Sequence, residues 1–252
     1  MRRISGIVLL QILLVFFPCP VSPAPGFVAP AQAAIISAHE FARLREEMVK
    51  TQVEKRGIRN SRVLSAMRKV PRHLFVPETF RSVAYMDQPL PIGEGQTVSQ
   101  PYIVALMTEL AEIEEGEKVL EVGTGSGYQA AVLLEMTPKV YSIEINPKLA
   151  EFARRNLRKA GCSRVRTVVG DGYQGWPDAA PFDAILVTAA PDHIPQPLLD
   201  QLAEGGVLVV PVGSRRSVQT LTKIRKKEGK ILTEKSHLVS FVPLIRKHTG
   251  VQ

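Results

Sequence analysis

The chain has 252 residues, of which 45% are apolar and 22% are charged, and its formal net charge is +8. This composition is ordinary for a globular protein with a buried core and excludes a chain that is disordered throughout. The basic excess is compatible with an acidic partner. Solvated lysines and arginines account for it equally well, because net charge bears on solubility and association and not on a particular site.

The first 34 residues differ in kind from the rest. Arg2 and Arg3 precede an apolar run over residues 4–17, and small residues at 31–33 follow. A basic start, a short apolar run and a small-residue cleavage site are typical of a secretory signal peptide, and a membrane-spanning helix would need about 20 apolar residues. We expect an exported, periplasmic protein without stable membrane insertion, with residues 35–252 as a single domain. An uncleaved anchor and a cytoplasmic location are the alternatives.

The first part of this domain, residues 40–113, is expected to be helical and loop-rich and to lie on the substrate side. Helical spacing of apolar residues predicts a helix over 40–56 and a second short helix capped by Asn60. Residues 72–96 are rich in proline and glycine, which predicts an ordered loop. Ser99 is expected to open a third helix, with a proline in its first turn.

From residue 118 to the end, short apolar strands alternate with helices. Strands are expected at 118–122, 139–145, 164–169, 182–188 and 207–212, and helices at 126–136, 147–160 and 198–202. This alternation predicts an α/β fold with a doubly wound, mostly parallel, Rossmann-like sheet and helices on both faces. Strands at 219–225 and 238–244, with a turn at 228–229, predict an antiparallel finish to the sheet.

A glycine-rich loop with the sequence E-V-G-T-G-S-G-Y follows the first of these strands, and its glycines are Gly123, Gly125 and Gly127. In such sheets ligands bind at the carboxyl ends of the strands, where glycines let the backbone turn beside the ligand. A dinucleotide loop would place its third glycine where Tyr128 stands. The negative charge of Glu121 would repel a pyrophosphate but would attract the ammonium and sulfonium of S-adenosylmethionine. The sequence therefore predicts this cofactor.

Acidic residues at the ends of the next two strands agree with this cofactor. Glu144 ends the second strand, where a carboxylate can accept hydrogen bonds from both ribose hydroxyls. The spacing E-x-G-x-G-x-G resembles the first motif of class I methyltransferases. That resemblance places Asp171, followed by Gly172, where an acidic side chain meets the adenine amino group, although an aspartate between two glycines also fits a plain turn. No cysteine and histidine cluster has metal-ligand spacing, so no metal is expected.

The residues before the first strand narrow the methyl acceptor. The run Y-M-D-Q-P-L-P-I-G at 85–93 and the run G-Q-T-V-S-Q-P-Y at 95–102 resemble the protein-L-isoaspartate O-methyltransferase family, and the resemblance covers roughly residues 48–244. It implies methylation of the α-carboxylate of L-isoaspartyl residues in damaged proteins, which initiates repair through a succinimide. Isoaspartyl peptides and proteins are therefore the expected partners, with no nucleic acid, and a monomer is favoured.

The same resemblance implies that Ser99 is the active-site serine, with Thr97, Val98 and Gln100 beside it on the substrate side. We expect Ser99 to orient the substrate carboxylate by a hydrogen bond, because a carboxylate is already a nucleophile at neutral pH and needs no general base. Capping of the following helix is the alternative role for this serine.

Two other functions stay open at this point. One is a class I methyltransferase that acts on RNA or on a small molecule. The basic C-terminal part would suit RNA, although no set of aromatic residues accompanies its charges. The other is a non-catalytic binding protein that kept the fold, against which Glu121, Glu144, Asp171 and Ser99 all argue.

Overall fold

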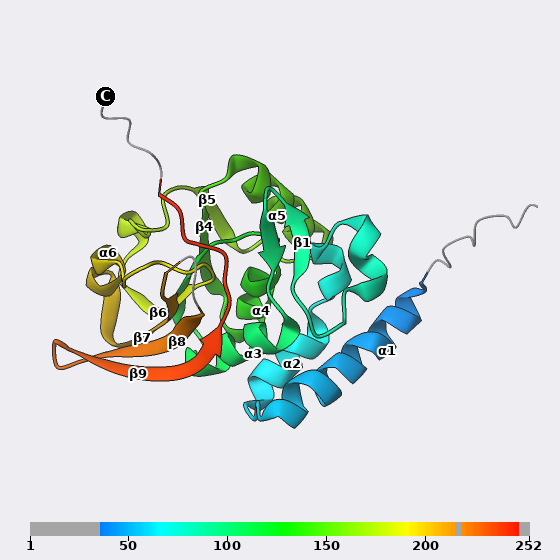
Figure 1. Ribbon diagram of the computed structural model, residues 1–252, viewed down its shortest axis with the longest axis horizontal. Coiled ribbons are helices and arrows are strands. Elements are labelled where there is room, and N and C mark those ends of the chain that lie inside the picture. Colours follow the sequence, from blue (N-terminus) through cyan, green and yellow to red (C-terminus); the bar gives the residue numbers. More distant parts are fainter. Residues whose placement is uncertain (1–35, 215–217, 247–252) are drawn as a thin grey trace, which may run out of the picture. The chain divides into compact units, whose positions relative to one another are not determined.

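The computed structural model describes residues 36–214 and 218–246, so the expected export signal at residues 1–34 lies outside the described residues. In the described part, seven strands form one sheet with the order β5-β4-β3-β6-β7-β8-β9 (Figure 1). Their bounds are Lys118–Val122 (β3), Lys139–Glu144 (β4), Arg166–Val169 (β5), Phe182–Val187 (β6), Leu202–Val212 (β7), Gln219–Lys227 (β8) and Lys230–Val239 (β9). The strands from β5 to β7 are parallel, whereas β8 and β9 are antiparallel to their neighbours. The predicted mostly parallel fold with an antiparallel finish is confirmed.

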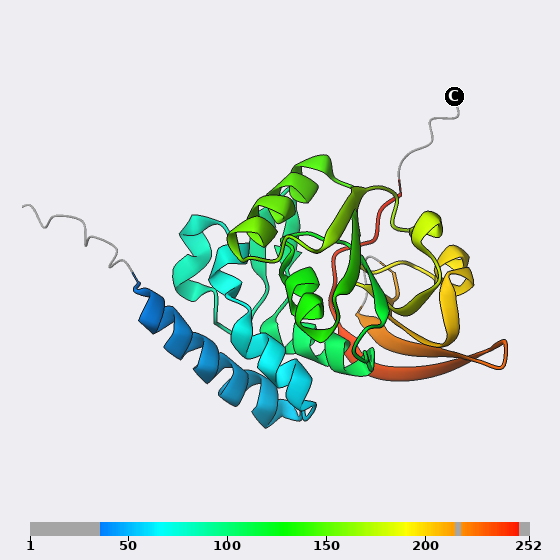
Figure 2. The same cartoon turned by 180° about the vertical axis from the view of Figure 1, so that it is seen from behind.

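Both faces of the central strands are buried, which explains why these strands are rich in apolar residues. In β6, Ala184 and Leu186 belong to the apolar cluster on one face, and Ile185 and Val187 belong to the cluster on the other. The first cluster includes residues of the helices α1 (Ala38–Met48), α2 (Ser61–Lys69), α3 (Pro101–Leu110), α4 (Tyr128–Met136) and α5 (Pro147–Lys159), and the second includes α6 (Gln196–Asp200). Figures 1 and 2 show α1 to α5 on the same side of the sheet.

The first two helices begin and end as local signals predict. Helix α1 continues through a π-helical turn, Val49–Val53, and a 3-10 turn to Gly57, whose φ of 105° ends it. The side chain of Asn60 accepts hydrogen bonds from the first backbone N–H groups of α2, so the predicted cap is confirmed. Among the described residues, no helix combines the length and the apolar character needed to cross a membrane.

The segment predicted as a loop over residues 72–96 is more regular than expected. It contains two 3-10 helices, Arg72–Phe75 and Glu78–Val83, and the strand β1 (Leu90–Gly93). Strand β1 pairs with β2 (Gln96–Val98) in an antiparallel hairpin. Strands of three or four residues are too short to show an alternating pattern, and the prolines and glycines around them predict a loop instead.

Several predicted boundaries were wrong, among them the start of β7, which is Leu202 and not residue 207. Helix α3 begins at Pro101 and not at Ser99. A proline disfavours helical backbone at the residue before it, and Gln100 is accordingly extended, with a ψ of 140°. The last strand was predicted at 238–244 but lies at Lys230–Val239, because the turn at residues 228–229 sets the pairing of β8 with β9 directly after it. Nearly all of β9 is exposed and so lacks the apolar pattern of a buried strand. Helix α6 ends at Asp200, and Leu202 already belongs to β7.

The residues after β9 return across the carboxyl ends of the parallel strands. We call residues 240–246 the C-terminal segment. Ala190, just beyond β6, donates a backbone hydrogen bond to Val242 over 2.8 Å and accepts one from Leu244 over 2.8 Å. The C-terminal segment is therefore fixed beside the end of the sheet where ligands of such folds bind.

Candidate active site

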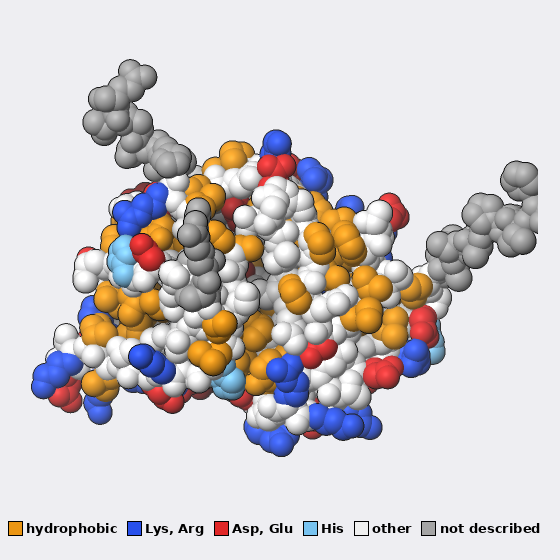
Figure 3. All heavy atoms as spheres, viewed as in Figure 1, with side chains coloured by type: hydrophobic (Ala, Val, Ile, Leu, Met, Phe, Trp, Pro, Cys, Tyr) orange, Lys and Arg blue, Asp and Glu red, His pale blue; other side chains and the backbone are white. Residues whose placement is uncertain are grey.

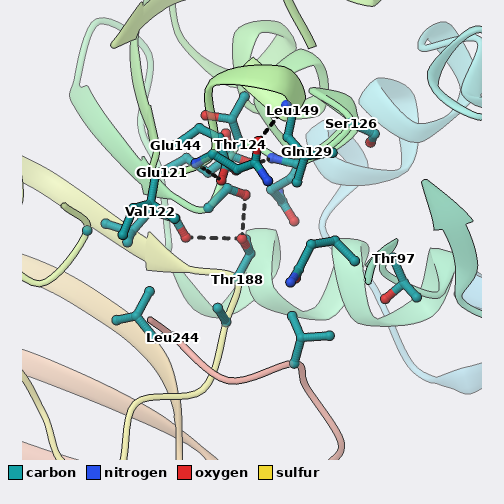
Figure 4. A pocket seen from close by; sticks show the side chains of 18 of the residues that line it. Thr97, Glu121, Val122, Thr124, Ser126, Gln129, Glu144, Leu149, Thr188 and Leu244 are labelled. Atoms are coloured by element: carbon teal, nitrogen blue, oxygen red, sulfur yellow. Dashed lines mark hydrogen bonds between the residues drawn. The ribbon is translucent and has the colours of Figure 1, made fainter. Parts of the chain in front are cut away.

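A cavity of about 920 Å³, its open mouth included, lies at the carboxyl ends of β3, β4 and β6. Its walls come from the β1–β2 hairpin, the glycine loop, the start of α5 and the C-terminal segment. Figure 4 shows Glu121, Thr124, Gln129 and Glu144 gathered around the glycine loop, with Thr97 on another wall.

Most of the site residues predicted from the sequence meet in this cavity. Eight of them line it: Thr97, Val98, Ser99, Glu121, Gly123, Gly125, Glu144 and Gly172. Within the described chain, Gln100, Gly127 and Asp171 are not among the lining residues. The cavity thus joins the two sequence regions that were interpreted separately, the glycine loop and the segment around Ser99.

The glycine loop needs its first glycine for two reasons. Gly123 has a φ of 101°, a conformation that other residues rarely adopt, and a Cβ at this position would lie 2.5 Å from the Thr188 hydroxyl oxygen. That hydroxyl donates a hydrogen bond to the Gly123 carbonyl over 2.7 Å. Thr188 was missed in the sequence, although it directly follows β6, the strand that neighbours β3.

The third glycine has a structural task, and its predicted cofactor contact stays a prediction. Gly127 precedes α4 with a φ of 87°, and a Cβ there would lie 3.1 Å from the side chain of Leu157 in α5. The glycine therefore allows α4 and α5 to approach closely, which is the role that a third glycine also takes between helix and strand in dinucleotide folds.

Glu121 is fully buried at the end of β3. Its Oε2 accepts a hydrogen bond from the Ser142 hydroxyl, which also lies 2.5 Å from the Thr124 hydroxyl. Its Oε1 has no hydrogen-bond partner among the described residues. Burial raises the pKa of this carboxyl to about 8, and the neighbouring Glu144 adds to the rise. A cation in the cavity would favour the ionised carboxylate and give Oε1 a partner.

Glu144 holds the glycine loop against the end of β4. Its Oε2 accepts a hydrogen bond from the Gly125 N–H over 2.9 Å, and its Oε1 accepts one from the Asn146 N–H over 3.0 Å. A carboxylate has about four acceptor sites, so two acceptor sites are left over for hydroxyl donors in the cavity. This arrangement is compatible with the predicted ribose contact, which stays a prediction.

The hairpin that carries Thr97 is tied to the cofactor side through Glu94. The Glu94 carboxylate lies 3.2 Å from the Lys148 ammonium and accepts a hydrogen bond from the Asn146 side chain over 3.3 Å. The hydrogen bond from Asn146 and the contacts with Lys148 lower the pKa of Glu94. Glu94 was missed because its partners lie more than 50 residues away and no local pattern marks them.

Ser99 stands between β2 and α3 in the chain, and it lines the cavity. Its hydroxyl makes no hydrogen bond to any residue that the structure describes, and α3 begins two residues later without a side-chain cap. The alternative that Ser99 caps this helix is therefore contradicted. The hydroxyl has its donor and acceptor capacity available for a molecule in the cavity.

Asp171 forms a turn at the edge of the site. Its Oδ1 accepts a hydrogen bond from the Tyr173 N–H over 2.9 Å, so the turn that the sequence also allowed is present. The following Gly172 lines the cavity, where a Cβ would lie 2.5 Å from the Val122 side chain. The predicted adenine contact of Asp171 stays a prediction. Within the described residues, no three His, Cys, Asp or Glu side chains are grouped as for a metal ion.

Comparisons with known proteins show the family. The family model described as "Protein-L-isoaspartate(D-aspartate) O-methyltransferase (PCMT)" matches residues 43–249. A protein-L-isoaspartate O-methyltransferase of Methanoculleus marisnigri is 60% identical over 83% of this chain and 95% of its own length. One of Gloeobacter violaceus is 56% identical over 79% of this chain and 98% of its own length.

Two solved structures extend the similarity to the fold. A protein-L-isoaspartate O-methyltransferase superposes with a TM-score of 0.71 at 32% identity, over 79% of this chain and 65% of that chain. A chain from Plasmodium falciparum that carries the same family name, in complex with S-adenosyl-L-homocysteine, superposes with a TM-score of 0.72 at 27% identity, over 80% of this chain and 98% of that chain. The chain therefore belongs to the protein-L-isoaspartate(D-aspartate) O-methyltransferase family.

Proposed function

We propose that this protein transfers the methyl group of S-adenosylmethionine to the α-carboxylate of L-isoaspartyl residues in damaged proteins. The observation that carries this conclusion is the family match over residues 43–249, together with a cavity in which Ser99 and the glycine loop share one space. The protein is a carboxyl O-methyltransferase of this family, and S-adenosylmethionine is its methyl donor.

The residues of the cavity fit this donor. The buried Oε1 of Glu121 has no partner in the described chain and would accept from an ammonium, and Glu144 has acceptor sites left for the ribose hydroxyls. The close packing at Gly123 and Gly172 leaves no room for a side chain at either position. Bound S-adenosylmethionine would supply a methyl group that the sulfonium already activates.

The chemistry left to the protein is binding and orientation. The α-carboxylate of the substrate is ionised at neutral pH and is itself the nucleophile, so no proton has to be removed. The Ser99 hydroxyl would donate a hydrogen bond to one carboxylate oxygen and direct the other toward the methyl carbon. Alignment of this kind can supply several kcal/mol of the barrier.

The product explains the repair role that we propose. A methyl ester is a better leaving group than a carboxylate, so the esterified isoaspartyl residue closes to a succinimide without further catalysis. Hydrolysis of the succinimide then returns part of the damaged residues to normal aspartate. The substrates would accordingly be peptides and unfolded or flexible segments of proteins that contain isoaspartate.

The direct test uses purified protein, labelled S-adenosylmethionine and two peptides of the same sequence, one with isoaspartate and one with aspartate. We expect base-labile label on the isoaspartyl peptide alone. Ser99→Ala is the matched variant, and it should bind S-adenosylhomocysteine normally while transferring little methyl. Absence of a base-labile ester on the isoaspartyl peptide would refute the assignment, and label in RNA would support the rival acceptor.

Three of the basic residues that suggested RNA, all on β8, are engaged within the protein, whereas Arg215 and Arg216 lie outside the described residues. Lys223 and Arg225 of β8 both form ion pairs with Glu112, and the Lys226 ammonium donates to the Leu202 carbonyl over 2.9 Å. In the space-filling view, Lys and Arg side chains lie at several separate places with acidic side chains among them (Figure 3). These contacts favour a structural role for the charges on β8 over a phosphate-binding surface.

Export of the protein is a separate proposal that rests on the sequence of residues 1–34. A basic start, an apolar run and a small-residue cleavage site support it. Fractionation of the native host with N-terminal sequencing of the mature form tests it, and we expect a periplasmic protein that begins near residue 35. A cytoplasmic protein that begins at Met1 would refute export without touching the proposed activity.

A further inference from the structure

Gln129 is a buried polar residue in the wall of the cavity to which the mechanism above gives no task. It is the second residue of α4, directly after the glycine loop, and it is 7% exposed. Its Nε2 donates a hydrogen bond to the Thr108 hydroxyl over 2.9 Å, which links α4 to α3. Its Oε1 is buried and has no hydrogen-bond partner among the described residues.

The orientation of the Gln129 amide is determined by Thr108. The single proton of the Thr108 hydroxyl is donated to the Val104 carbonyl over 2.8 Å, so this hydroxyl can only accept from Gln129. The amide nitrogen must therefore face Thr108, and the carbonyl oxygen must face away from it. Buried acceptors without a partner are rare in native proteins and call for an explanation.

A second unpartnered acceptor lies in the same cavity. Glu121 Oε1 is also buried without a partner in the described chain, and Figure 4 shows Glu121 and Gln129 on the same wall, around Thr124. Two acceptors that lack donors in one cavity fit a ligand group with several N–H donors. The ammonium of S-adenosylmethionine has three such donors, whereas its carboxylate and sulfonium have none.

The Gln129 carbonyl oxygen also offsets the positive end of the α4 helix dipole, which would otherwise repel a bound ammonium. The N-terminus of a helix carries a partial positive charge, which repels a cation placed beside it. Gln129 lies in the first turn of α4, so an ammonium bound next to the glycine loop needs side-chain acceptors to offset this charge. One carboxylate and one oriented amide oxygen meet this need.

We propose that Gln129 binds the amino-acid end of the cofactor: its Oε1 accepts a hydrogen bond from the ammonium of S-adenosylmethionine beside Glu121. Thr108 is a positioning residue that presents this oxygen by engaging the amide nitrogen. The inference rests on the proposed function, because it takes S-adenosylmethionine as the ligand of the cavity.

The test compares two ligands in calorimetric titrations of the full chain: S-adenosylhomocysteine and its analogue that lacks the α-amino group. Gln129→Leu should weaken binding of S-adenosylhomocysteine about tenfold, which corresponds to about 1.4 kcal/mol. The same variant should bind the deamino analogue as tightly as the wild type. Thr108→Val, which keeps Gln129 but frees its amide, should show a smaller loss for S-adenosylhomocysteine and none for the analogue.

Equal weakening of both ligands would overturn the proposal, because a merely structural residue cannot tell an amino group from its absence. A lower kcat/KM for the isoaspartyl peptide with unchanged binding of S-adenosylhomocysteine would also overturn it, by placing Gln129 against the substrate. Thermal unfolding checks that each variant folds, and Gln129→Met, closer in shape, replaces the leucine variant where it does not. A wild-type protein that binds S-adenosylhomocysteine but esterifies no isoaspartyl peptide would refute the proposed function and leave this inference standing.

Discussion

We predict that the buried carboxyl of Glu121 makes the free energy of unfolding fall as the pH rises. In the folded protein, burial raises the pKa of this group to about 8 from its ordinary value of 4.5. The folded state therefore holds a proton that the unfolded state releases between these two pH values. Stability is greatest where both states are protonated and falls as the pH rises toward 8.

The size of the effect follows from proton linkage. One proton held by the folded state alone lowers the free energy of unfolding by at most about 1.4 kcal/mol per pH unit, so the limit between pH 5 and pH 8 is about 4 kcal/mol. Glu121→Gln keeps the shape of the side chain and an acceptor for Ser142 but cannot ionise. It should be about as stable as the wild type at pH 5 and more stable by a few kcal/mol at pH 8.

The measurement is urea unfolding of the wild type and Glu121→Gln at pH 5, 6, 7 and 8. The difference between the two proteins isolates this carboxyl, because other titrating groups are common to both. Saturating S-adenosylhomocysteine should flatten the pH dependence of the wild type, since its ammonium favours the ionised carboxylate. A difference between the two proteins that stays constant within about 1 kcal/mol across this range would refute the reasoning.

Three further changes test the site. Ser99→Ala should lower kcat/KM for an isoaspartyl peptide 10- to 100-fold, as expected for a lost orienting contact, with the affinity for S-adenosylhomocysteine unchanged in titrations; an equal loss of affinity would place the serine against the cofactor. Gly123→Ala should destabilise the protein by about 2 kcal/mol or more in urea unfolding, because it adds a clash with Thr188 to backbone strain, whereas Gly205→Ala, with a φ of 81° and open space around it, should show the strain alone. Glu94→Gln, which loses the ion pair with the lysine of α5, should release S-adenosylhomocysteine a few-fold faster in stopped-flow displacement at low salt, and the difference should shrink at high salt. An identical release rate would contradict the view that this ion pair ties the hairpin to the cofactor side of the cavity.

Much of the fold could be predicted because its signals are local. Strand β3 was predicted with its observed bounds, since most residues of a strand buried on both faces are apolar. The Asn60 cap and the end of the first helix at Gly57 depend on one or two neighbouring residues. The boundary at Ser99 was wrong although the decisive signal, the effect of Pro101 on the residue before it, is local as well.

The parts that could not be predicted depend on chain pairing at a distance. Strand β9 is exposed along most of its length, so its position follows from the β8–β9 turn and from pairing and not from an apolar pattern. The C-terminal segment closes the cavity through hydrogen bonds with Ala190, about 50 residues earlier in the chain. Neither feature produces a periodic pattern of apolar residues in the sequence.

The amino-acid sequence by itself determined the type of cofactor, because Glu121 and the glycines stand close together in one short segment. The class of acceptor followed from the resemblance of the segment around Ser99 to a known family. Only the tertiary structure decided what each of these side chains touches. It assigned Gly127 to helix packing and left the Glu121 and Gln129 oxygens without partners in the described chain. The physical reason is that burial, pKa and hydrogen-bond satisfaction depend on neighbours in space, and folding brings those neighbours from segments tens of residues apart.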